Sequence, residues 1–459
     1  MVWCAPMLAW ACAAPIHAGQ SDFGFGTSFT YNSNIARLRT DPKAEWTQAL
    51  ITGLSYQENT IDVTTRVLAQ VERRHYYRHT FSDETSGIFD GSMVWNVLPR
   101  RLAWTVEDVL REIQVDITAP NTPSNLTKAN ALNSGPDFTL PLSSTNKAVI
   151  GARYGRIDIK DSILDTERYT GYVRALHMSS PQTTLSLNYE AARVYFEPGA
   201  QTFEKVSRED WFGRFDNSSG LNTTTIDLGT SRVTPYGAPA NCLVSSVTPA
   251  PPPCNAPRSQ GTRLARVALS QALSAQSNLR VSLSDQISDT YTDLMANLAG
   301  SALPTDARIP ASSTPSAGAS FVSVDTYRSK LGSLAYVNNS GHFVYTLKAY
   351  ERRVDFTLGE DFNERTAGLA WTWMYSGAMS FNASAGYVKR AFDGLDRQDT
   401  GRVFGAGMFF RLNRNVTITM QGDRTEQHST IDSNSFVDNR VMLLLGYSTG
   451  PLYQPLSRR

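Results

Sequence analysis

The sequence predicts an all-β fold: a transmembrane antiparallel up-and-down β-barrel of about twenty strands. Three observations predict it. Apolar and polar residues alternate with a period of two along most of the chain, and short turns alternate with longer links. In addition, no apolar run reaches the roughly 18 residues that a membrane helix requires.

The hairpin Thr366–Tyr387 shows the period of two most clearly. Its first arm alternates Leu369 and Trp371 with small or polar neighbours, and its second arm repeats the pattern around Phe381 after a short turn at 375–377. Each arm therefore has one apolar face. Its aromatic residues lie near the ends of that face, where amphipathic rings settle at the head-group level of a bilayer.

Composition favours strands and argues against nucleic acid as a partner. The chain has 459 residues, of which 41% are hydrophobic and 19% charged, and its formal net charge is +1. The 20 Phe, 19 Tyr and 8 Trp residues favour strands over helices. A nucleic-acid-binding protein would show a basic excess or a basic tail, and neither is present.

The segment before the first strand reads as a signal peptide, residues 1–18. It is apolar and free of charge, and it ends on the small residue Ala18. A buried first element is the alternative, and Pro6 and Pro15 argue against it. Residues 19–448 then form the barrel, and residues 449–459 form a C-terminal periplasmic tail. The terminal aromatic read by the insertion machinery is either Tyr447 or Tyr453.

Two cysteines remain after removal of the leader, Cys242 and Cys254, in a Pro-rich stretch without a strand pattern. A disulfide between them suits an oxidising compartment. Two free thiols are the alternative. The spacing does not suit a zinc site, and we expect no metal.

The period of two marks the candidate strands along the mature chain. Pro141 lacks the N–H that a ladder needs, so the strand that contains it is the weakest, with about eighteen strands as the alternative. In order, the strands are Asp22–Tyr31, Trp46–Tyr56, Thr60–Tyr76, Ile88–Val97, Arg101–Leu110, Asp137–Ser143, Lys147–Ile157, Arg168–Met178, Thr183–Val194, Glu209–Asp216, Asn222–Ser231, Arg263–Leu273, Asn278–Gln286, Val324–Val337, His342–Arg352, Arg365–Met374, Ala378–Lys389, Arg402–Leu412, Val416–Arg424 and Asn439–Ser448.

The links alternate between short turns and longer segments, as periplasmic turns and extracellular loops do in membrane barrels. A soluble all-β fold, the alternative, has no reason to keep this alternation. A barrel of this size is too wide to be filled by its wall side chains. The lumen is therefore either an aqueous channel or one narrowed by inward-folding links, and three links are long enough for this: Arg111–Gly135, Val233–Thr262 and Ser288–Ser323.

Charged residues concentrate on the face opposite the apolar one, because a charge facing lipid at the bilayer midplane costs about 2–4 kcal/mol for Arg or Lys. We therefore expect a polar lumen in which basic residues outnumber acidic ones, favouring anions. The alternative is that these residues pair with Glu72, Glu107, Glu190 and Asp423 and hold the wall together. The predicted lumen residues are Arg66, Gln70, Glu72, Arg153, Arg174, Glu190, Arg266, Arg280, Arg328, Lys330, Lys348, Arg352 and Arg440.

Sequence motifs give no sign of catalysis. The chain has no nucleophile-elbow, zinc-protease or phosphate-loop pattern, and its histidines are scattered. We expect no enzymatic activity and no cofactor. An enzyme with a Ser/His pair on the barrel rim is the alternative, because such a pair leaves no local motif.

Three segments carry a family resemblance: FTYNSNIARLRTD, RRHYYRHTFSDETSGIFDG and APNTPSNLTKANALNSGPDFTLPLS. They resemble the β-barrel porins encoded with exopolysaccharide biosynthesis genes, the EpsL-like or beta-barrel porin 2 family. Asn32 and Ser33 depart from the family, which commonly has acidic residues there. The resemblance implies an outer-membrane barrel associated with exopolysaccharide secretion. The partners it implies are outer-membrane lipid, polysaccharide or small anionic solutes, and periplasmic polysaccharide-export proteins.

These observations together predict a channel or export component of the bacterial outer membrane with a basic lumen. Two other functions remain open at this point: a structural or adhesive barrel whose loops bind polymer, and a general diffusion porin.

Overall fold

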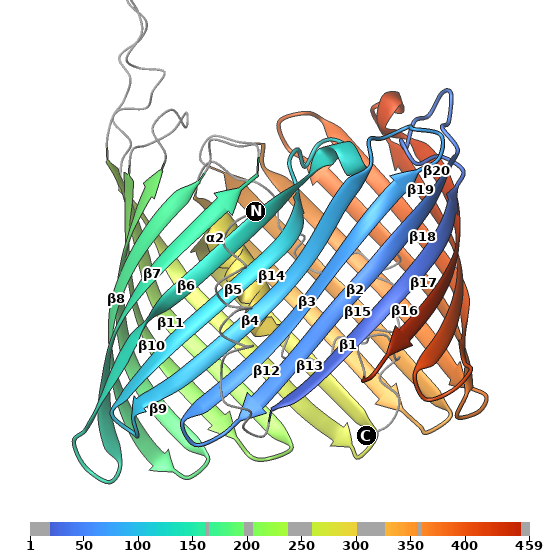
Figure 1. The fold of residues 1–459 in the computed structure, drawn as a ribbon. Coiled ribbons are helices and arrows are strands. Elements are labelled where there is room, and N and C mark those ends of the chain that lie inside the picture. Colours follow the sequence, from blue (N-terminus) through green and yellow to red (C-terminus); the bar gives the residue numbers. More distant parts are fainter. Residues whose placement is uncertain are drawn as a thin grey trace, which may run out of the picture.

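The computed structural model describes residues 19–160, 165–196, 205–236, 259–300, 326–356 and 360–450. They form one closed sheet of twenty antiparallel strands (Figure 1). Each strand pairs with its sequence neighbours, and β1 pairs with both β2 and β20, which closes the barrel. The predicted twenty-stranded barrel is confirmed, and the alternative of eighteen strands is wrong.

The strands mostly extend the predicted ones at one or both ends. Their bounds are β1 (Gln20–Asn32), β2 (Glu45–Asn59), β3 (Val63–Tyr76), β4 (Glu84–Leu98), β5 (Leu102–Gln114), β6 (Leu126–Pro141), β7 (Asn146–Ile159), β8 (Thr166–Ser180), β9 (Thr183–Phe196), β10 (Lys205–Ser218), β11 (Asn222–Tyr236), β12 (Gln260–Ser274), β13 (Ser277–Ser288), β14 (Tyr327–Asn339), β15 (Phe343–Phe356), β16 (Phe362–Met374), β17 (Met379–Phe392), β18 (Arg397–Arg411), β19 (Val416–Ser429) and β20 (Phe436–Ser448).

The two ends of the barrel differ in their connections. At one end, which we call the short-turn end, strands are joined by tight turns such as 60–62, 275–276 and 412–415. At the other, the long-loop end, links such as 33–44 and 115–125 join them. In membrane barrels short turns are periplasmic and long loops extracellular, which orients this one.

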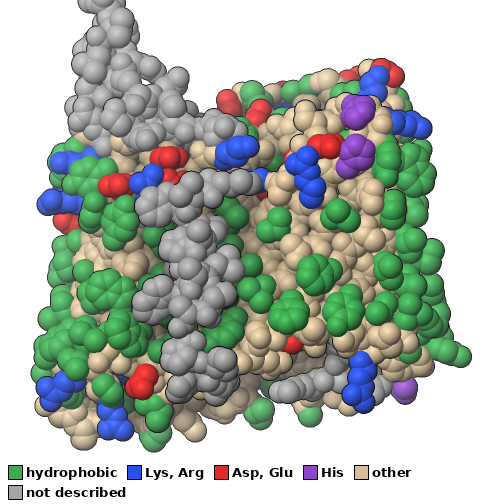
Figure 2. Space-filling view, in the orientation of Figure 1, with side chains coloured by type: hydrophobic (Ala, Val, Ile, Leu, Met, Phe, Trp, Pro, Cys, Tyr) green, Lys and Arg blue, Asp and Glu red, His purple; other side chains and the backbone are tan. Residues whose placement is uncertain are grey.

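The outer wall is apolar because alternate residues of a strand point to opposite sides, and in each strand the hydrophobic set points outward. Leu187 and Leu228 are each 61% exposed, and Leu369 on β16 is 49% exposed while its neighbour Ala370 is buried. Figure 2 shows hydrophobic side chains spread over the wall and charged side chains gathered toward its rims. A soluble monomer rarely exposes so much apolar surface, so this wall faces lipid.

Strand β6 differs most from the prediction, which assigned residues 111–135 to a loop. It begins at Leu126 and pairs with β5 and β7, so the link is only 115–125. Its Asn, Ala and Ser residues hide the strand from a hydrophobicity pattern, since its small inward residues Ala129 and Ala131 are buried under other lumen residues. The ladder to β7 breaks around Pro136, which has no N–H to donate.

Two segments of the described chain lie in the lumen. Helix α2 (Thr290–Gly300) follows β13 and lies inside the barrel (Figure 1). The β5–β6 link, with the 3₁₀ turn η1 (Pro123–Asn125), folds inward from the long-loop end. The narrowed lumen is therefore the correct alternative. No helix in the described ranges is long and apolar enough to cross a membrane.

Several predictions fall on residues outside the described ranges. These are the signal peptide, the disulfide between Cys242 and Cys254, and most of the C-terminal tail. The described barrel wall runs from Gln20 to Ser448.

Candidate functional site in the barrel lumen

The inner face of the wall holds most of the predicted lumen residues, because they share the strand parity that points away from the exposed apolar side chains. The structure places there Arg66, Gln70, Glu72, Arg153, Arg174, Glu190, Arg266, Arg280, Lys348, Arg352 and Arg440.

Arg328 and Lys330 are the exceptions, and their predicted lumen position is wrong. They share the outward parity of Leu334 on β14, whereas Tyr327 is buried and faces the lumen. The Arg328 guanidinium pairs with Asp285 at 2.6 Å. Both cations lie near the long-loop end of β14, above the apolar belt. An outward charge there stays in contact with water, so the rule that charges point inward does not apply.

Many inward arginines are paired with carboxylates, as the wall-holding alternative proposed. The closest distances are 2.6 Å for Arg153–Asp137, 2.8 Å for Arg208–Asp210, 2.7 Å for Arg214–Asp227 and 2.9 Å for Arg266–Asp227. Arg440 pairs with Asp423 and Arg390 with Glu364. Glu72 pairs with Arg74, and Glu107 accepts a hydrogen bond from Asn133. Most of these pairs join adjacent strands, whereas Arg208–Asp210 and Glu72–Arg74 each lie within one strand. A cation held by a carboxylate is less available to a solute.

Within the described part of the chain, five inward cations have no carboxylate partner: Arg66, Lys147, Arg174, Arg280 and Lys348. Each lies nearer the short-turn end of its strand than the long-loop end. Three carboxylates of the same region, Asp22, Glu107 and Asp216, also have no cation partner among the described residues, and they lie on β1, β5 and β10. The sector from β12 to β16 therefore carries positive charge at this end of the lumen.

We call the part of the inner wall around Arg280 on β13 and Lys348 on β15 the cation sector. Both residues pair in register with Ala335 of β14, one from each side. Strands lie about 4.8 Å apart, so the two cations are anchored about 10 Å apart across a methyl group. Ser282 and Ser333, joined at 2.6 Å, and Gly368 opposite Lys348 are small, neutral neighbours. Tyr350 follows Lys348 on the same inner face, opposite Ser333, and donates its hydroxyl to Glu364. The result is a polar part of the inner wall in which two cations stand on either side of a small side chain.

Helix α2 joins two parts of the wall across the lumen. Leu294 is fully buried against Ile113, Ala129, Ala131, Ile157 and Ile159 of β5, β6 and β7. Asp293, one residue earlier, accepts hydrogen bonds from Arg352 and from the Tyr327 hydroxyl, both at 2.6 Å, and also from Ser288. The helix is therefore held by an apolar contact on one side and by a charged pair on β14–β15 on the other.

A second charged pair holds the start of α2. The Arg168 guanidinium on β8 lies 3.2 Å from the carboxylate of Asp289 and 5.4 Å from the centre of the Tyr291 ring. Burial pushes the pKa of Asp289 upward, but the Arg168 charge and the hydrogen bonds from Thr292 outweigh it, and the pKa lies below its usual value. Asp289 is therefore ionised at neutral pH.

The β5–β6 link crosses toward β16–β18. The Asn125 amide donates to the carbonyls of Asp116, Ala119 and Pro120, which fixes the shape of the link. Ile117 at its tip packs with Tyr327, Val354, Phe362 and Phe392, and Arg390 donates to the Ile117 carbonyl at 3.4 Å. The link and α2 thus meet the same sector of wall, and together they narrow the lumen on the long-loop side of the cation sector.

Sequence reasoning missed α2 and the structural role of Asn125. A signal for the helix was present: Tyr291, Leu294 and Met295 follow the i, i+3, i+4 spacing of an amphipathic helix, and Asp293 lies in its first turn. No local signal identifies Asn125, because its partners are backbone carbonyls of its own link.

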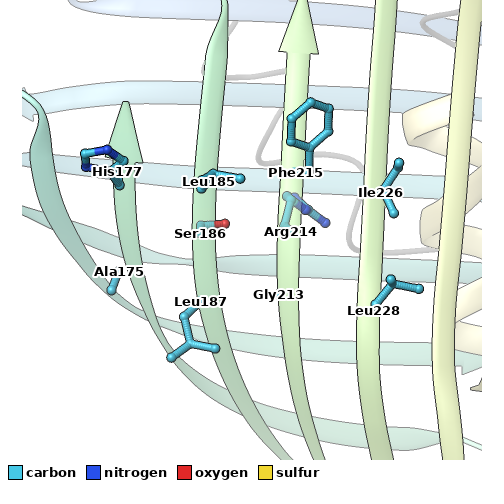
Figure 3. Close-up of a pocket in the computed structure, with 10 residues that line it drawn as sticks. All are labelled: Ala175, His177, Leu185, Ser186, Leu187, Gly213, Arg214, Phe215, Ile226 and Leu228. Atoms are coloured by element: carbon cyan, nitrogen blue, oxygen red, sulfur yellow. The ribbon is translucent and has the colours of Figure 1, made fainter. Parts of the chain in front are cut away.

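A hollow on the lipid-facing wall is a poor candidate for the functional site. It surrounds the bare backbone of Gly213, with Leu187 and Leu228 beside it (Figure 3). Its exposed leucines belong to the lipid-facing side of the wall, so the hollow does not open into the lumen. Nowhere in the described ranges do three or more His, Cys, Asp or Glu side chains gather in a way that could hold a metal ion.

Comparison with known proteins gives one family match. Residues 364–447 match the family described as "Putative beta-barrel porin 2". That range runs from β16 to β20 and covers less than a fifth of the chain. No curated protein matches the sequence.

Several solved structures are similar at low identity. A mutant of the ferric enterobactin receptor PfeA from Pseudomonas aeruginosa has a TM-score of 0.48 at 9% identity, covering 94% of this chain and 81% of that one. OpdK with vanillate, from the same organism, has a TM-score of 0.38 at 8% identity, with 94% and 99% covered. The copper transporter OprC has a TM-score of 0.45 at 11% identity, with 95% and 82% covered. At these TM-scores and identities, the properties of these proteins cannot be transferred to this chain.

The closed barrel, its lipid-facing wall and the porin-family match place the protein in the bacterial outer membrane, with a porin-like architecture.

Proposed function

We propose that the protein is an outer-membrane channel that carries an anionic solute or polymer outward, and that the anion is a bacterial exopolysaccharide. The observation that carries the proposal is the cation sector, where Arg280 and Lys348 flank Ala335 without carboxylate partners in the described part of the chain. The resemblance of three segments to the exopolysaccharide-associated porins supports the choice of substrate.

The distribution of charge supports an outward direction. Unpaired cations lie toward the short-turn end, which faces the periplasm, whereas Arg352 and Arg390 nearer the long-loop end are each held by a carboxylate. An anion entering from the periplasm meets free positive charge first, which raises its local concentration at the mouth. It then reaches the constriction made by α2 and the β5–β6 link.

The constriction acts as a gate in this proposal. Among the described side chains, α2 meets the wall through the ion pairs Arg168–Asp289 and Arg352–Asp293, the hydrogen bond from Tyr327 and a small apolar cluster on β5–β7. A bulky anion, or a periplasmic export protein docking at the short turns, could displace the helix by competing for these arginines.

Secretion in living cells tests the proposal. A deletion strain is complemented with the wild-type gene or with the double variant Arg280→Gln/Lys348→Gln, and the polysaccharide is measured in the medium and in the periplasm. We expect deletion to abolish secretion and the double variant to reduce it. A matched control, Arg328→Gln/Lys330→Gln, removes two outward cations and should secrete normally. Unchanged secretion and unchanged periplasmic polymer after deletion would rule out the export role.

A second candidate follows from the constriction itself. If α2 and the β5–β6 link never move, the barrel is a closed scaffold whose long loops bind polymer or other cells. Planar-bilayer recording separates the two candidates, because a closed scaffold gives no open-channel current under any condition, whereas a gated channel opens when α2 is released.

A further inference from the structure

A group of four cations covers the outer face of β16–β19 near the long-loop end. Arg365, Lys389, Arg402 and Arg424 share the outward parity of Leu369, Tyr387, Phe404 and Met420 on these strands. We call them the outer cation patch. They lie on the opposite side of the wall from the lumen, so a solute in the channel cannot reach them.

The patch carries more positive charge than its carboxylates neutralise. Glu351 pairs with Arg365 at 2.8 Å, and Glu426 pairs with Arg424 at 2.6 Å. Glu426 lies opposite Arg402 in the ladder but turns to Arg424 instead. Lys389 and Arg402 are left without a carboxylate partner among the described residues.

The register places like charges beside each other. Arg365 lies directly opposite Lys389 on the neighbouring strand, and Arg402 lies opposite Tyr387, two residues from Lys389. Like charges directly opposite on one face of a sheet destabilise it. Lys389 and Arg402 are diagonal neighbours, and an anion bound between them would offset the repulsion between their charges.

The height of the patch matches the membrane surface. A spanning strand uses about 9–11 residues, and on β17 that length runs from Met379 at the short-turn end to Lys389. Directly below the patch, toward the short-turn end, lie the exposed side chains of Tyr387 and Phe404. Aromatic residues mark the head-group level of the bilayer, so the cations stand at the height of the phosphates of the outer leaflet.

We propose that the outer cation patch binds the phosphate groups of a lipid in the outer leaflet, with Lys389 and Arg402 as the ligands and Tyr387 against the lipid body. Arg contributes two parallel N–H donors to a phosphate and Lys a point charge. The inference is independent of what the channel transports.

Lipid retention by the purified barrel tests the proposal. The intact protein in detergent is incubated with diphosphorylated lipid A, with enzymatically dephosphorylated lipid A, or with lipid A in the presence of inorganic phosphate, and bound lipid is counted by native mass spectrometry. We expect the diphosphorylated lipid to be retained. The Lys389→Gln/Arg402→Gln variant should retain about tenfold less, since charge-assisted hydrogen bonds are lost. Inorganic phosphate should not displace the lipid, because it lacks the acyl chains.

A matched control distinguishes the patch from general surface charge. Arg263 on β12 is exposed and also faces outward, but it lies on a different part of the wall from the outer cation patch. Arg263→Gln should retain lipid as the wild type does. Equal retention of dephosphorylated lipid, equal loss in Arg263→Gln, or unchanged retention in the double variant would each overturn the proposal. Heat-modifiable migration on unboiled gels shows that every variant is folded.

Discussion

Asp293 joins helix α2 to the barrel wall through its carboxylate. Its carboxylate accepts hydrogen bonds from Arg352, Tyr327 and Ser288, and the Arg352 side chain is only 6% exposed. Removing one partner of a buried ion pair costs about 3–5 kcal/mol. We expect a cost of this size to destabilise the docked position of α2 and to leave the strands unaffected.

We therefore predict that Asp293→Asn increases channel opening. Single-channel recording in planar bilayers should show longer or more frequent open events than the wild type shows. The matched control is Asp285→Asn, which removes an outward carboxylate of β13 paired with Arg328 at 2.6 Å. Wild-type currents from both variants would mean that α2 does not gate the lumen.

A second prediction concerns pH. The folded pKa of Asp289 lies below its usual value, because the Arg168 charge and hydrogen bonds from Thr292 outweigh the effect of burial. A depressed folded pKa stabilises the docked helix above the unfolded pKa, and this stabilisation is lost as the pH falls through the folded pKa. Opening should thus be constant from neutral pH down to the usual Asp range near 3.9 and increase below it.

Recordings at a series of pH values check this. Asp289→Asn, which cannot ionise, should open readily at neutral pH and lose the acid-dependent increase. If acid opens the variant and the wild type to the same further extent, another group is responsible.

The hairpin of β16 and β17 tests the assignment of faces at the scale of one element. Ala385 is exposed on the outer wall opposite Leu369, and the adjacent Ser384 faces the lumen opposite Ala370. Arg at the midplane of the lipid face costs about 2–4 kcal/mol, whereas a wet lumen accepts it. Ala385→Arg should therefore lower the amount of folded barrel in the membrane, and Ser384→Arg should leave it near wild type.

Membrane fractionation with unboiled gels measures both variants. Equal assembly of the two would mean that the faces of this hairpin are assigned wrongly.

Strands were predictable where an apolar face alternates with a polar one. The hairpin 366–387 and β20 show this alternation strongly, because their outward residues meet lipid and their inward residues meet water. Strand β6 was not predictable in this way. Its inward residues Ala129 and Ala131 and its outward residues Asn130 and Ser134 give no contrast in polarity. Only pairing with β5 and β7 reveals it, and pairing is not written in one strand alone.

The candidate site was predictable only in part. The alternation along each strand predicted that Arg280 and Lys348 point inward. It could not predict that Ala335 separates them or that no described carboxylate pairs with them, because both facts depend on the register between strands. Parity failed for Arg328 and Lys330, because the sequence does not show where the apolar belt ends. The sequence predicted the constriction only as one of two alternatives for the lumen, with three links long enough to form it.

At the scale of the whole molecule, closure through β1 and β20 leaves no sheet edge exposed to lipid. The wall is one closed, hydrogen-bonded sheet. Within the described residues, α2 and the β5–β6 link narrow the lumen and are held to the wall by side-chain contacts. The proposed function depends on this difference: the cation sector near the periplasm is part of the wall, whereas the constriction beyond it can be displaced.

The zero-current potential across a KCl gradient tests this account most directly. In the Asp293→Asn background, which opens the constriction, we predict selectivity for Cl⁻. Arg280→Glu/Lys348→Glu should shift the potential toward K⁺, and the outward control Arg328→Glu/Lys330→Glu should leave it unchanged. Selectivity for K⁺ in the parent, or an equal shift in both double variants, would contradict the claim that the cation sector selects the solute.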